Sequence, residues 1–295
     1  MSGPERVSLA RLAGFPLPAL AIDGDKEERG RVLVIAGGAK VPGAAILAGT
    51  AAMRAGAGKL QMAATPQAAL HLGFAVPEAA VIETAVDANG NLAVAADLRS
   101  AVEQVDAVVI GPGMTDETAA GALVGALLRT PGHAAFVLDA AAMTSLRPRD
   151  VQAIEGRLVL TPHAGEMAKL VGRPKPAVLQ DPLSAAREVS ATFQAVVVMK
   201  GAETFIATPQ GQAYLHEGGA IGLATSGSGD VLAGVIGGLM ARGAAPATAA
   251  IWSVCVHAAA GGRLAERLGP VGFLARELLG ELPALFGEAQ GPAPS

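Results

Sequence analysis

Short runs of apolar residues alternate along the chain with segments in which apolar residues recur every three or four positions. The short runs predict buried strands, and the spaced pattern predicts helices. The predicted strands are residues 32–36, 60–64, 80–84, 107–110, 135–138, 158–160 and 195–199. The predicted helices between them are residues 44–55, 116–128, 150–155 and 183–193. This alternation is typical of an α/β fold whose central sheet is mostly parallel.

Two later segments depart from the alternation. Residues 204–207 and 213–215 flank a turn-forming sequence at 209–212, which predicts a hairpin at an edge of the sheet. From Asp230 to about Leu285 the pattern is mainly helical.

No linker or internal repeat interrupts the chain. We therefore predict a single domain over residues 31–286. A lead-in over residues 1–30 would precede it, and a frayed tail over residues 287–295 would follow it.

The composition narrows the class of protein. The chain is 51% hydrophobic but only 3% aromatic, so Ala, Val and Leu must build the core. A net charge of −4 with no basic run excludes nucleic acid as a partner. The single cysteine, Cys255, lies in an apolar helical pattern, which predicts a buried packing residue in a reducing cytoplasm. We see neither a secretion signal nor a run of ~20 strongly apolar residues, and expect no membrane association.

Small and polar residues directly follow five of the predicted strands. They are Gly37 with Gly38, Gly111 to Gly113, Asp139, Thr161 to Glu166, and Lys200 with Gly201. The carboxyl ends of parallel strands lie at one edge of a sheet, and ligands of open α/β folds bind there. We therefore expect these five loops to form one site.

Residues 225–234, with the sequence TSGSGDVLAG, place glycines and serines just before an acid and an apolar helical pattern. Backbone N–H groups at such a helix start can hold a phosphate or a leaving oxyanion. A carboxylate beside that anion would be repelled, so Asp230 needs its own explanation. A general base that takes a proton from an attacking hydroxyl is one. A helix N-cap with a tight turn is the other.

The order of five motifs along the chain resembles that of the ADP/ATP-dependent NAD(P)H-hydrate dehydratases. The motifs are GPG at 111–113, VLDA at 137–140, TPHxGE at 161–166, KGxxT at 200–204 and GSGDVLAG at 227–234. The resemblance runs from about Arg31 to Gly262. It implies a ribokinase-like three-layer α/β/α sandwich, the stand-alone bacterial form of the enzyme and a homotetramer.

The resemblance also implies a reaction. Water adds to the nicotinamide ring of NADH or NADPH, and enzymes of this family dehydrate the S epimer of the product. They phosphorylate the ring hydroxyl and then release phosphate, with Mg²⁺ as the metal. Members similar to this chain convert ADP to AMP and phosphate, and ATP is the alternative donor. An NAD(P)H-hydrate epimerase would work alongside, without a stable complex.

Residue roles carry over by position. Asp230 would be the base, and Gly227, Ser228 and Gly229 would form the anion hole. The hydrate would contact Ala44, Gly113, His163 and Asp230. The nucleotide would contact Lys200, Gly201, Ala202, Glu203, Thr204 and Gly229. Glu166 and Asp139 would hold the metal, directly or through water. Structural roles stay open for several of these: helix capping for Glu166, turn capping for Asp139, packing for Ala44 and a solvated surface position for Lys200.

The chain departs from the family pattern at three places. The family usually has a second acid two residues after the acid of the VLDA motif, and Ala141 stands there in this chain. The run at 219–225 lacks the usual Asn and Pro, and the loop at 37–43 lacks the more usual serine after Gly. None of these changes removes the proposed base or anion hole. Two other functions remain open: a small-molecule kinase of the same fold, such as a hydroxyethylthiazole or hydroxymethylpyrimidine kinase, and a nucleotide sensor without catalysis. A kinase would leave a stable phosphorylated product, whereas a sensor would bind nucleotide without turnover.

Overall fold

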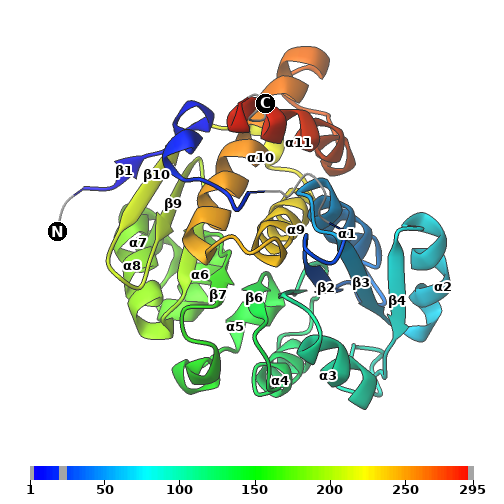
Figure 1. Cartoon of the computed structure of the whole chain (residues 1–295). Coiled ribbons are helices and arrows are strands. Elements are labelled where there is room, and N and C mark those ends of the chain that lie inside the picture. The colour runs from blue at the N-terminus through cyan, green and yellow to red at the C-terminus, as the bar shows by residue number, and fades with distance from the viewer. Residues whose placement is uncertain (1–2, 20–24, 292–295) are drawn as a thin grey trace.

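A computed structural model describes residues 3–19 and 25–291. Within these residues ten strands form one sheet, in the order β1-β10-β9-β8-β7-β6-β5-β2-β3-β4 (Figure 1). The strands are β1 (Glu5–Arg6), β2 (Arg31–Ile35), β3 (Lys59–Ala64), β4 (Ala79–Glu83), β5 (Ala107–Ile110), β6 (Ala135–Leu138), β7 (Leu158–Leu160), β8 (Val196–Met199), β9 (Glu203–Ala207) and β10 (Ala213–Glu217). Strand β9 is antiparallel to both neighbours, and every other neighbouring pair in the sheet is parallel.

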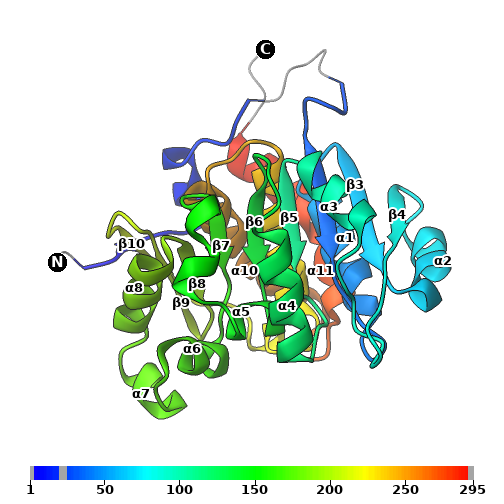
Figure 2. The ribbon, with the colours of Figure 1, turned by 90° about the horizontal axis from the view of Figure 1, so that it is seen from below.

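Helices cover both faces of the sheet, which confirms the three-layer α/β/α sandwich (Figures 1 and 2). Those packed on one face are α1 (Gly43–Arg54), α2 (Pro66–Ala75), α9 (Ser228–Ala241), α10 (Pro246–Leu268) and α11 (Ala275–Gln290). Those on the other are α3 (Ala96–Glu103), α4 (Glu117–Leu127), α5 (Ala141–Thr144), α6 (Ala164–Val171), α7 (Lys175–Gln180) and α8 (Pro182–Phe193). Among the helices described, none is long and apolar enough to cross a membrane.

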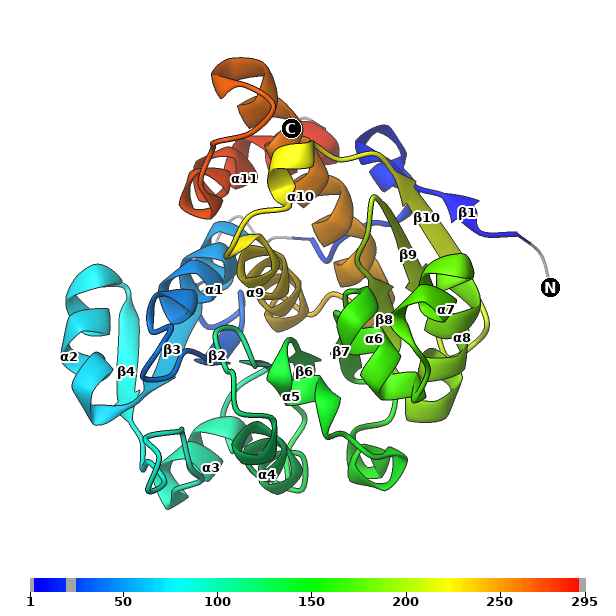
Figure 3. The ribbon, with the colours of Figure 1, turned by 180° about the vertical axis from the view of Figure 1, so that it is seen from behind.

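The central helix α9 shows how a core with few aromatic residues is built. It lies beside α1 over the middle of the sheet (Figure 3). A Cβ on Gly234 would come within 2.8 Å of the Ala48 Cα, so the two helix backbones approach closely. Small residues thus replace bulky ones as the means of excluding water, and they hold the first turn of α9 in a fixed position over the sheet.

The strand predictions are confirmed. The predicted strands at 107–110, 135–138 and 158–160 coincide with β5, β6 and β7, and the others differ by a residue at either end. The hairpin of β9 and β10 is also present, but the short strand β1 lies outside it.

One helix prediction is wrong, and several helices were not predicted. Residues 150–155 form no α-helix: Asp150 ends one short 3₁₀ turn, Pro148–Asp150, and a second covers Gln152–Ile154. The Asp150 carboxylate caps the first turn by accepting from the Arg147 N–H at 3.0 Å. Helix α2 escaped prediction because it buries only Leu72 and leaves Leu70 and Phe74 exposed. Helices α3, α5, α6 and α7 are short, so each spans too few turns for a repeating apolar pattern to stand out in the sequence.

The lead-in is part of the domain. Val7 donates its N–H to the Leu215 carbonyl at 2.9 Å, Leu12 is fully buried, and the Trp252 indole donates to the Phe15 carbonyl at 2.5 Å. No domain boundary therefore falls at residue 30 or 31 within the described structure.

The predicted frayed tail begins too early. Helix α11 continues through residues 287–290 to Gln290, and Glu288 is ion-paired with Arg263 of α10. The prediction of fraying is wrong for these residues because that contact extends the helix. The rest of the predicted tail, residues 292–295, lies outside the described residues.

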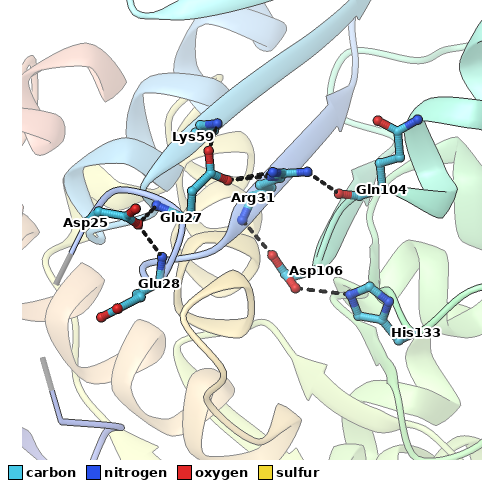
Figure 4. Close-up of polar contacts among 8 residues, drawn as sticks. All are labelled: Asp25, Glu27, Glu28, Arg31, Lys59, Gln104, Asp106 and His133. Atoms are coloured by element: carbon cyan, nitrogen blue, oxygen red, sulfur yellow. Dashed lines mark hydrogen bonds and ion pairs between the residues drawn. The ribbon is translucent and has the colours of Figure 1, made fainter. Parts of the chain in front are cut away.

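A polar network covers the amino-terminal edge of the sheet, opposite the predicted site (Figure 4). The Asp106 carboxylate accepts from the Arg31 N–H at 2.8 Å and lies 3.1 Å from His133 Nε2. Glu27 accepts from the Arg31 guanidinium at 2.6 Å and is also paired with Lys59. The network joins the starts of β2, β3 and β5, and its exposed ion pairs are each worth about 0–1 kcal/mol.

Candidate active site

A buried ion pair lies at the carboxyl ends of β6, β7 and β8. Asp139 follows β6, and its Oδ1 accepts from the Thr161 hydroxyl at 2.6 Å and from the Lys200 ammonium at 2.8 Å. The side chains of Asp139 and Lys200 are only 5% and 21% exposed. Lys200 is not a solvated surface residue, and the structure brings three of the five predicted strand-end loops together at this point.

The ion pair fixes the charge of both partners. Burial alone would raise the pKa of Asp139, but the attraction and hydrogen bond of Lys200 and the Thr161 hydroxyl hold that pKa below its ordinary value. Burial alone would lower the pKa of Lys200, but the charges of Asp139, Glu166 and Asp230 raise it. Both groups therefore stay ionised near neutral pH, with Lys200 as the cation among three carboxylates.

Backbone strain marks the residue after Asp139. Ala140 has φ +49° and ψ −132°, a region that residues with a Cβ rarely adopt. Such strain costs about 1–3 kcal/mol and persists where the surroundings require it. Here the Ala140 N–H bonds to the Asp139 carboxylate and helps to lower its pKa.

The first turn of α9 faces the ion pair. Gly227 precedes the helix with φ +91°, a left-handed conformation that glycine adopts without strain. A Cβ on Gly229 would lie 3.3 Å from Lys200 Nζ and 3.9 Å from Asp139 Oδ2. The N–H groups of this turn therefore lie beside a fixed cation, an arrangement that suits an anion.

Asp230 has an unusual acidity. It lies in the first turn of α9 and is partly buried. Burial and the nearby charge of Asp139 raise the pKa of Asp230 to about 7, against the opposing attraction of Lys200. Because a carboxylate with a pKa near the working pH can both accept and release a proton, Asp230 is suited to general-base chemistry.

A buried histidine supports this turn and was missed in the sequence. His257 of α10 places its Nε2 3.0 Å from both the Ser228 hydroxyl and the Ser228 carbonyl. Since a carbonyl can only accept, Nε2 carries the proton. Burial lowers the pKa of His257 to about 4, so the ring stays neutral. The Ser228 hydroxyl is thereby turned toward α10, and the Ser228 N–H donates to the Thr225 carbonyl at 3.3 Å.

His163 and Glu166 cap helix α6 together. His163 Nδ1 accepts from the N–H groups of Gly165 and Glu166 at 2.9 and 3.1 Å, and Glu166 Oε2 accepts from the His163 N–H at 2.8 Å. The His163 side chain is nevertheless 58% exposed, and a backbone bridge lays it beside Lys200. The capping role that the sequence left open for Glu166 is present.

Gly113 and Ala44 contact each other at the β2 and β5 end of the same edge. A Cβ on Gly113 would lie 2.6 Å from the Ala44 Cβ and 2.7 Å from the Val41 carbonyl. Glycine is therefore required here by the fold itself, in addition to any contact with a ligand. Ala44 is buried at the start of α1, so packing accounts for it as well.

The segment after Lys200 turns outward. Gly201, Ala202 and Glu203 are exposed, and Thr204 is half-buried in β9. Only Lys200 of the predicted nucleotide segment reaches the ion pair. The other four form an open surface next to it.

The carboxylates near Lys200 are compatible with the predicted Mg²⁺ site. The described residues contain no group of three His, Cys, Asp or Glu side chains that could hold a metal. Mg²⁺, however, usually takes only one or two carboxylates and completes its shell with water and phosphate oxygens. Glu166 and Asp139 both lie close enough to Lys200 to raise its pKa, so they suit such a shared site.

Gly229→Val tests the position of the first turn. The branched side chain would press on the Lys200 ammonium, so we expect ADP affinity and turnover to fall together by about tenfold or more. Calorimetric titration with ADP and a steady-state assay measure both. Gly280→Val, an open position in α11, is the matched control. Unchanged ADP affinity in Gly229→Val would contradict this arrangement.

Comparisons with known proteins identify the fold and the family of this chain. The fold is ribokinase-like: a solved ADP/ATP-dependent NAD(P)H-hydrate dehydratase from Bacillus subtilis, co-crystallised with ATP/Mg²⁺, superposes with a TM-score of 0.84 at 28% identity, covering 98% of this chain and 100% of that one. The NAD(P)H-hydrate dehydratase family model matches residues 32–284. The chain belongs to this family.

Two curated relatives show how far the similarity extends. An ADP-dependent (S)-NAD(P)H-hydrate dehydratase from Xanthomonas campestris is 47% identical over 290 residues, covering 97% of this chain and 98% of that protein. A bifunctional NAD(P)H-hydrate repair enzyme from Moorella thermoacetica is 38% identical and covers 90% of this chain, which spans 51% of that protein. The family prediction is therefore confirmed.

Proposed function

We propose that this protein is an ADP-dependent (S)-NAD(P)H-hydrate dehydratase that returns hydrated NADH and NADPH to the reduced cofactors. The observation that carries the proposal is Asp230, a carboxyl with a pKa of about 7 in the first turn of α9 beside the Lys200 ammonium. The 47% identical relative of that name and the family match support it over a small-molecule kinase.

The proposed reaction balances without an external oxidant or reductant. Asp230 takes the proton of the hydrate's ring hydroxyl as the oxygen attacks the terminal phosphorus of ADP. The bond from that phosphorus to the bridging oxygen breaks, and AMP leaves. The ring nitrogen then expels the new phosphate from the carbon beside it, and the next ring carbon releases a proton to water as the ring double bond forms. Hydrate and ADP give NAD(P)H, AMP and phosphate.

The residues divide into four roles. Backbone N–H groups of Gly227, Ser228 and Gly229 stabilise the charge that develops on the transferred phosphoryl group. Lys200, with residues 201–204 and Gly229, holds the nucleotide, and ATP is the alternative donor. Ala44, Gly113, His163 and Asp230 hold the hydrate. Glu166 and Asp139 would hold Mg²⁺, directly or through water, and the ion would neutralise phosphate charge.

His163 allows hydrate binding to be separated from helix capping. In His163→Ala both are lost, so we expect a KM for the hydrate about tenfold higher and a stability lower by about 0.5–2 kcal/mol. His163→Asn keeps an N-cap acceptor and loses the imidazole, so only the KM should rise. Initial rates and chemical denaturation measure the two effects. A normal KM in His163→Asn would remove His163 from the hydrate site.

Product analysis tests the function itself. Phosphorus NMR of a reaction of (S)-NADHX with ADP should show AMP and orthophosphate in equal amounts, matched by the NADH formed. A stable phosphorylated hydrate would instead identify a kinase. ADP binding without any product would identify a nucleotide sensor.

A second enzyme, the oligomeric state and the cellular location are part of the same proposal. An NAD(P)H-hydrate epimerase working alongside would convert the R epimer, since a bifunctional repair enzyme is among the relatives. We also propose a homotetramer in the cytoplasm. Sedimentation equilibrium of the purified protein tests the oligomeric state.

A further inference from the structure

A cavity lies beside the candidate site, on the side away from the nucleotide segment. It has a volume of about 400 Å³ and lies at the carboxyl ends of β2 and β5. The cavity is lined by residues from three segments: Gly38 and Lys40 after β2, Asn89 and Asn91 before α3, and Gly113 and Asp116 after β5. Its volume lies in the range of small-molecule sites.

One wall of this cavity is preorganised by hydrogen bonds. The Asn91 amide donates to Asp87 Oδ2 at 3.0 Å and to Asp116 Oδ2 at 3.3 Å. Asp116 in turn accepts from the Ala119 N–H at 2.9 Å as the N-cap of α4. The segment before α3 is thus tied to the start of α4, and the wall has little conformational freedom to lose when a ligand binds.

The other wall carries a cation without a partner. Lys40 is exposed, lines the cavity and makes no ion pair among the residues that the structure describes. A phosphate in the cavity would supply the missing charge. The nearby amide of Asn89 and the hydroxyl of Thr115 offer groups that can bond to a ribose or a base.

The sheet order places this cavity close to Asp139 of the ion pair, which follows β6. Strands β6, β5 and β2 are consecutive neighbours, so two strand spacings, about 10 Å in all, separate the ends of β6 and β2. The nucleotide segment after β8 lies on the opposite side of β6. Gly113, one of the proposed hydrate contacts, also lines the cavity. A dinucleotide with its nicotinamide end near Asp230 would extend in this direction.

We propose that this cavity binds the adenosine half of the hydrated dinucleotide, with Lys40 paired to a phosphate of that half. The inference rests on the proposed function, and it names the part of the substrate that the catalytic cluster does not reach. Lys40 acts on affinity for the whole dinucleotide and takes no part in the chemistry.

The first test compares a complete substrate with a truncated one. We expect Lys40→Gln to lower kcat/KM for (S)-NADHX about tenfold, the usual effect of losing a charge-assisted contact. The same variant should process the hydrate of reduced nicotinamide mononucleotide, which lacks the adenosine half, at the wild-type rate. Lys175→Gln, an exposed lysine of α7 outside the cavity, is the matched control. Equal losses on the complete and the truncated hydrate, or no loss on either NADHX or NADPHX, would overturn the proposal.

A second substrate pair identifies the phosphate. If Lys40 pairs with the pyrophosphate, Lys40→Gln affects NADHX and NADPHX alike. If it pairs with the 2′-phosphate, the variant affects NADPHX alone, and the tenfold loss is seen only with that hydrate.

The second test does not depend on turnover. With the nucleotide site saturated by ADP, ADP-ribose should bind the wild-type protein in a calorimetric titration. Lys40→Gln should weaken that binding about tenfold if the pyrophosphate is the partner, and Ala119→Phe, which fills the cavity from α4, should abolish it. Absence of ADP-ribose binding to the wild type, or unchanged binding in Ala119→Phe, would overturn the proposal. Failure of the proposed function would appear separately, as wild-type protein that turns over neither hydrate.

Discussion

Asp230→Asn is expected to lower turnover by about 10²–10⁴ while leaving ADP affinity within a few-fold of the wild type. The amide keeps the shape of the side chain but cannot take the proton of the hydrate. Steady-state rates and a calorimetric ADP titration measure the two quantities. Turnover near the wild-type level would contradict the assignment of Asp230 as the base.

The same substitution should stabilise the protein at high pH. The pKa of Asp230 is raised from 3.8 to about 7 in the folded state, so the folded state binds the extra proton between these values and loses stability as the pH rises through them. Asparagine does not ionise, so the variant does not lose this stability as the pH rises. After allowance for partial exposure, we expect a gain of about 1–3 kcal/mol above pH 7 that disappears near pH 4. Chemical denaturation at several pH values measures it.

The raised pKa also predicts a pH profile for the wild-type enzyme. The base must be ionised, so kcat/KM should rise through pH of about 7 and then level off. Asp139→Asn removes a charge that raises the pKa of Asp230, so any residual activity should rise at a lower pH. An unchanged midpoint of the pH profile in Asp139→Asn would contradict its assignment to Asp230 with a pKa raised by Asp139.

Lys200→Met should have the largest effect on stability of the substitutions considered. It leaves the buried Asp139 carboxylate without its cation, which typically costs about 3–5 kcal/mol of unfolding free energy. ADP binding should weaken as well, because the cation beside the first turn of α9 is lost. Chemical denaturation and calorimetry measure the two effects.

An exposed ion pair serves as the control for the buried one. Lys169 is ion-paired with Glu117, and both side chains are about half exposed, so Lys169→Met should cost only about 0–1 kcal/mol. Adding Asp139→Asn to Lys200→Met should recover part of the loss, because no uncompensated charge remains. A loss in Lys200→Met no larger than that in Lys169→Met would contradict the buried ion pair.

The edge on which the site lies could be predicted from the sequence because parallel strands impose it. The short apolar runs identified seven parallel strands, and the residues that follow five of them had to meet at the carboxyl edge. Asp139, Thr161 and Lys200 do so. The roles of these residues stay predictions, because geometry alone does not report chemistry.

Other features depend on tertiary contacts that have no local pattern. His257 lies in an apolar helical run as Cys255 does, and nothing in the sequence pairs it with Ser228, 29 residues away. Cys255 is buried as predicted, and burial raises the pKa of its thiol to about 12, which suits packing and not nucleophilic chemistry. Helix α2 was missed because its exposed Leu70 and Phe74 obscure the apolar face.

Two of the three departures from the family pattern, at Ala141 and Ala220, lie outside the ion pair and the first turn of α9, whereas the third, the loop at 37–43, lines the proposed dinucleotide cavity. Ala141, where a second acid is usual, is buried at the start of α5, two residues after Asp139. Ala220 precedes a short 3₁₀ turn and is partly buried. The ion pair, the first turn of α9 and Asp230 are all present, although the second acid at position 141 and the usual Asn of the run at 219–225 are missing.

The most direct test of the central claim is the near-ultraviolet absorbance of dihydronicotinamide after the protein is mixed with (S)-NADHX and Mg²⁺, with ADP, with ATP or without nucleotide. The account predicts a rise that requires nucleotide and is supported by ADP. No rise with either nucleotide, from folded protein that still binds ADP, would contradict it.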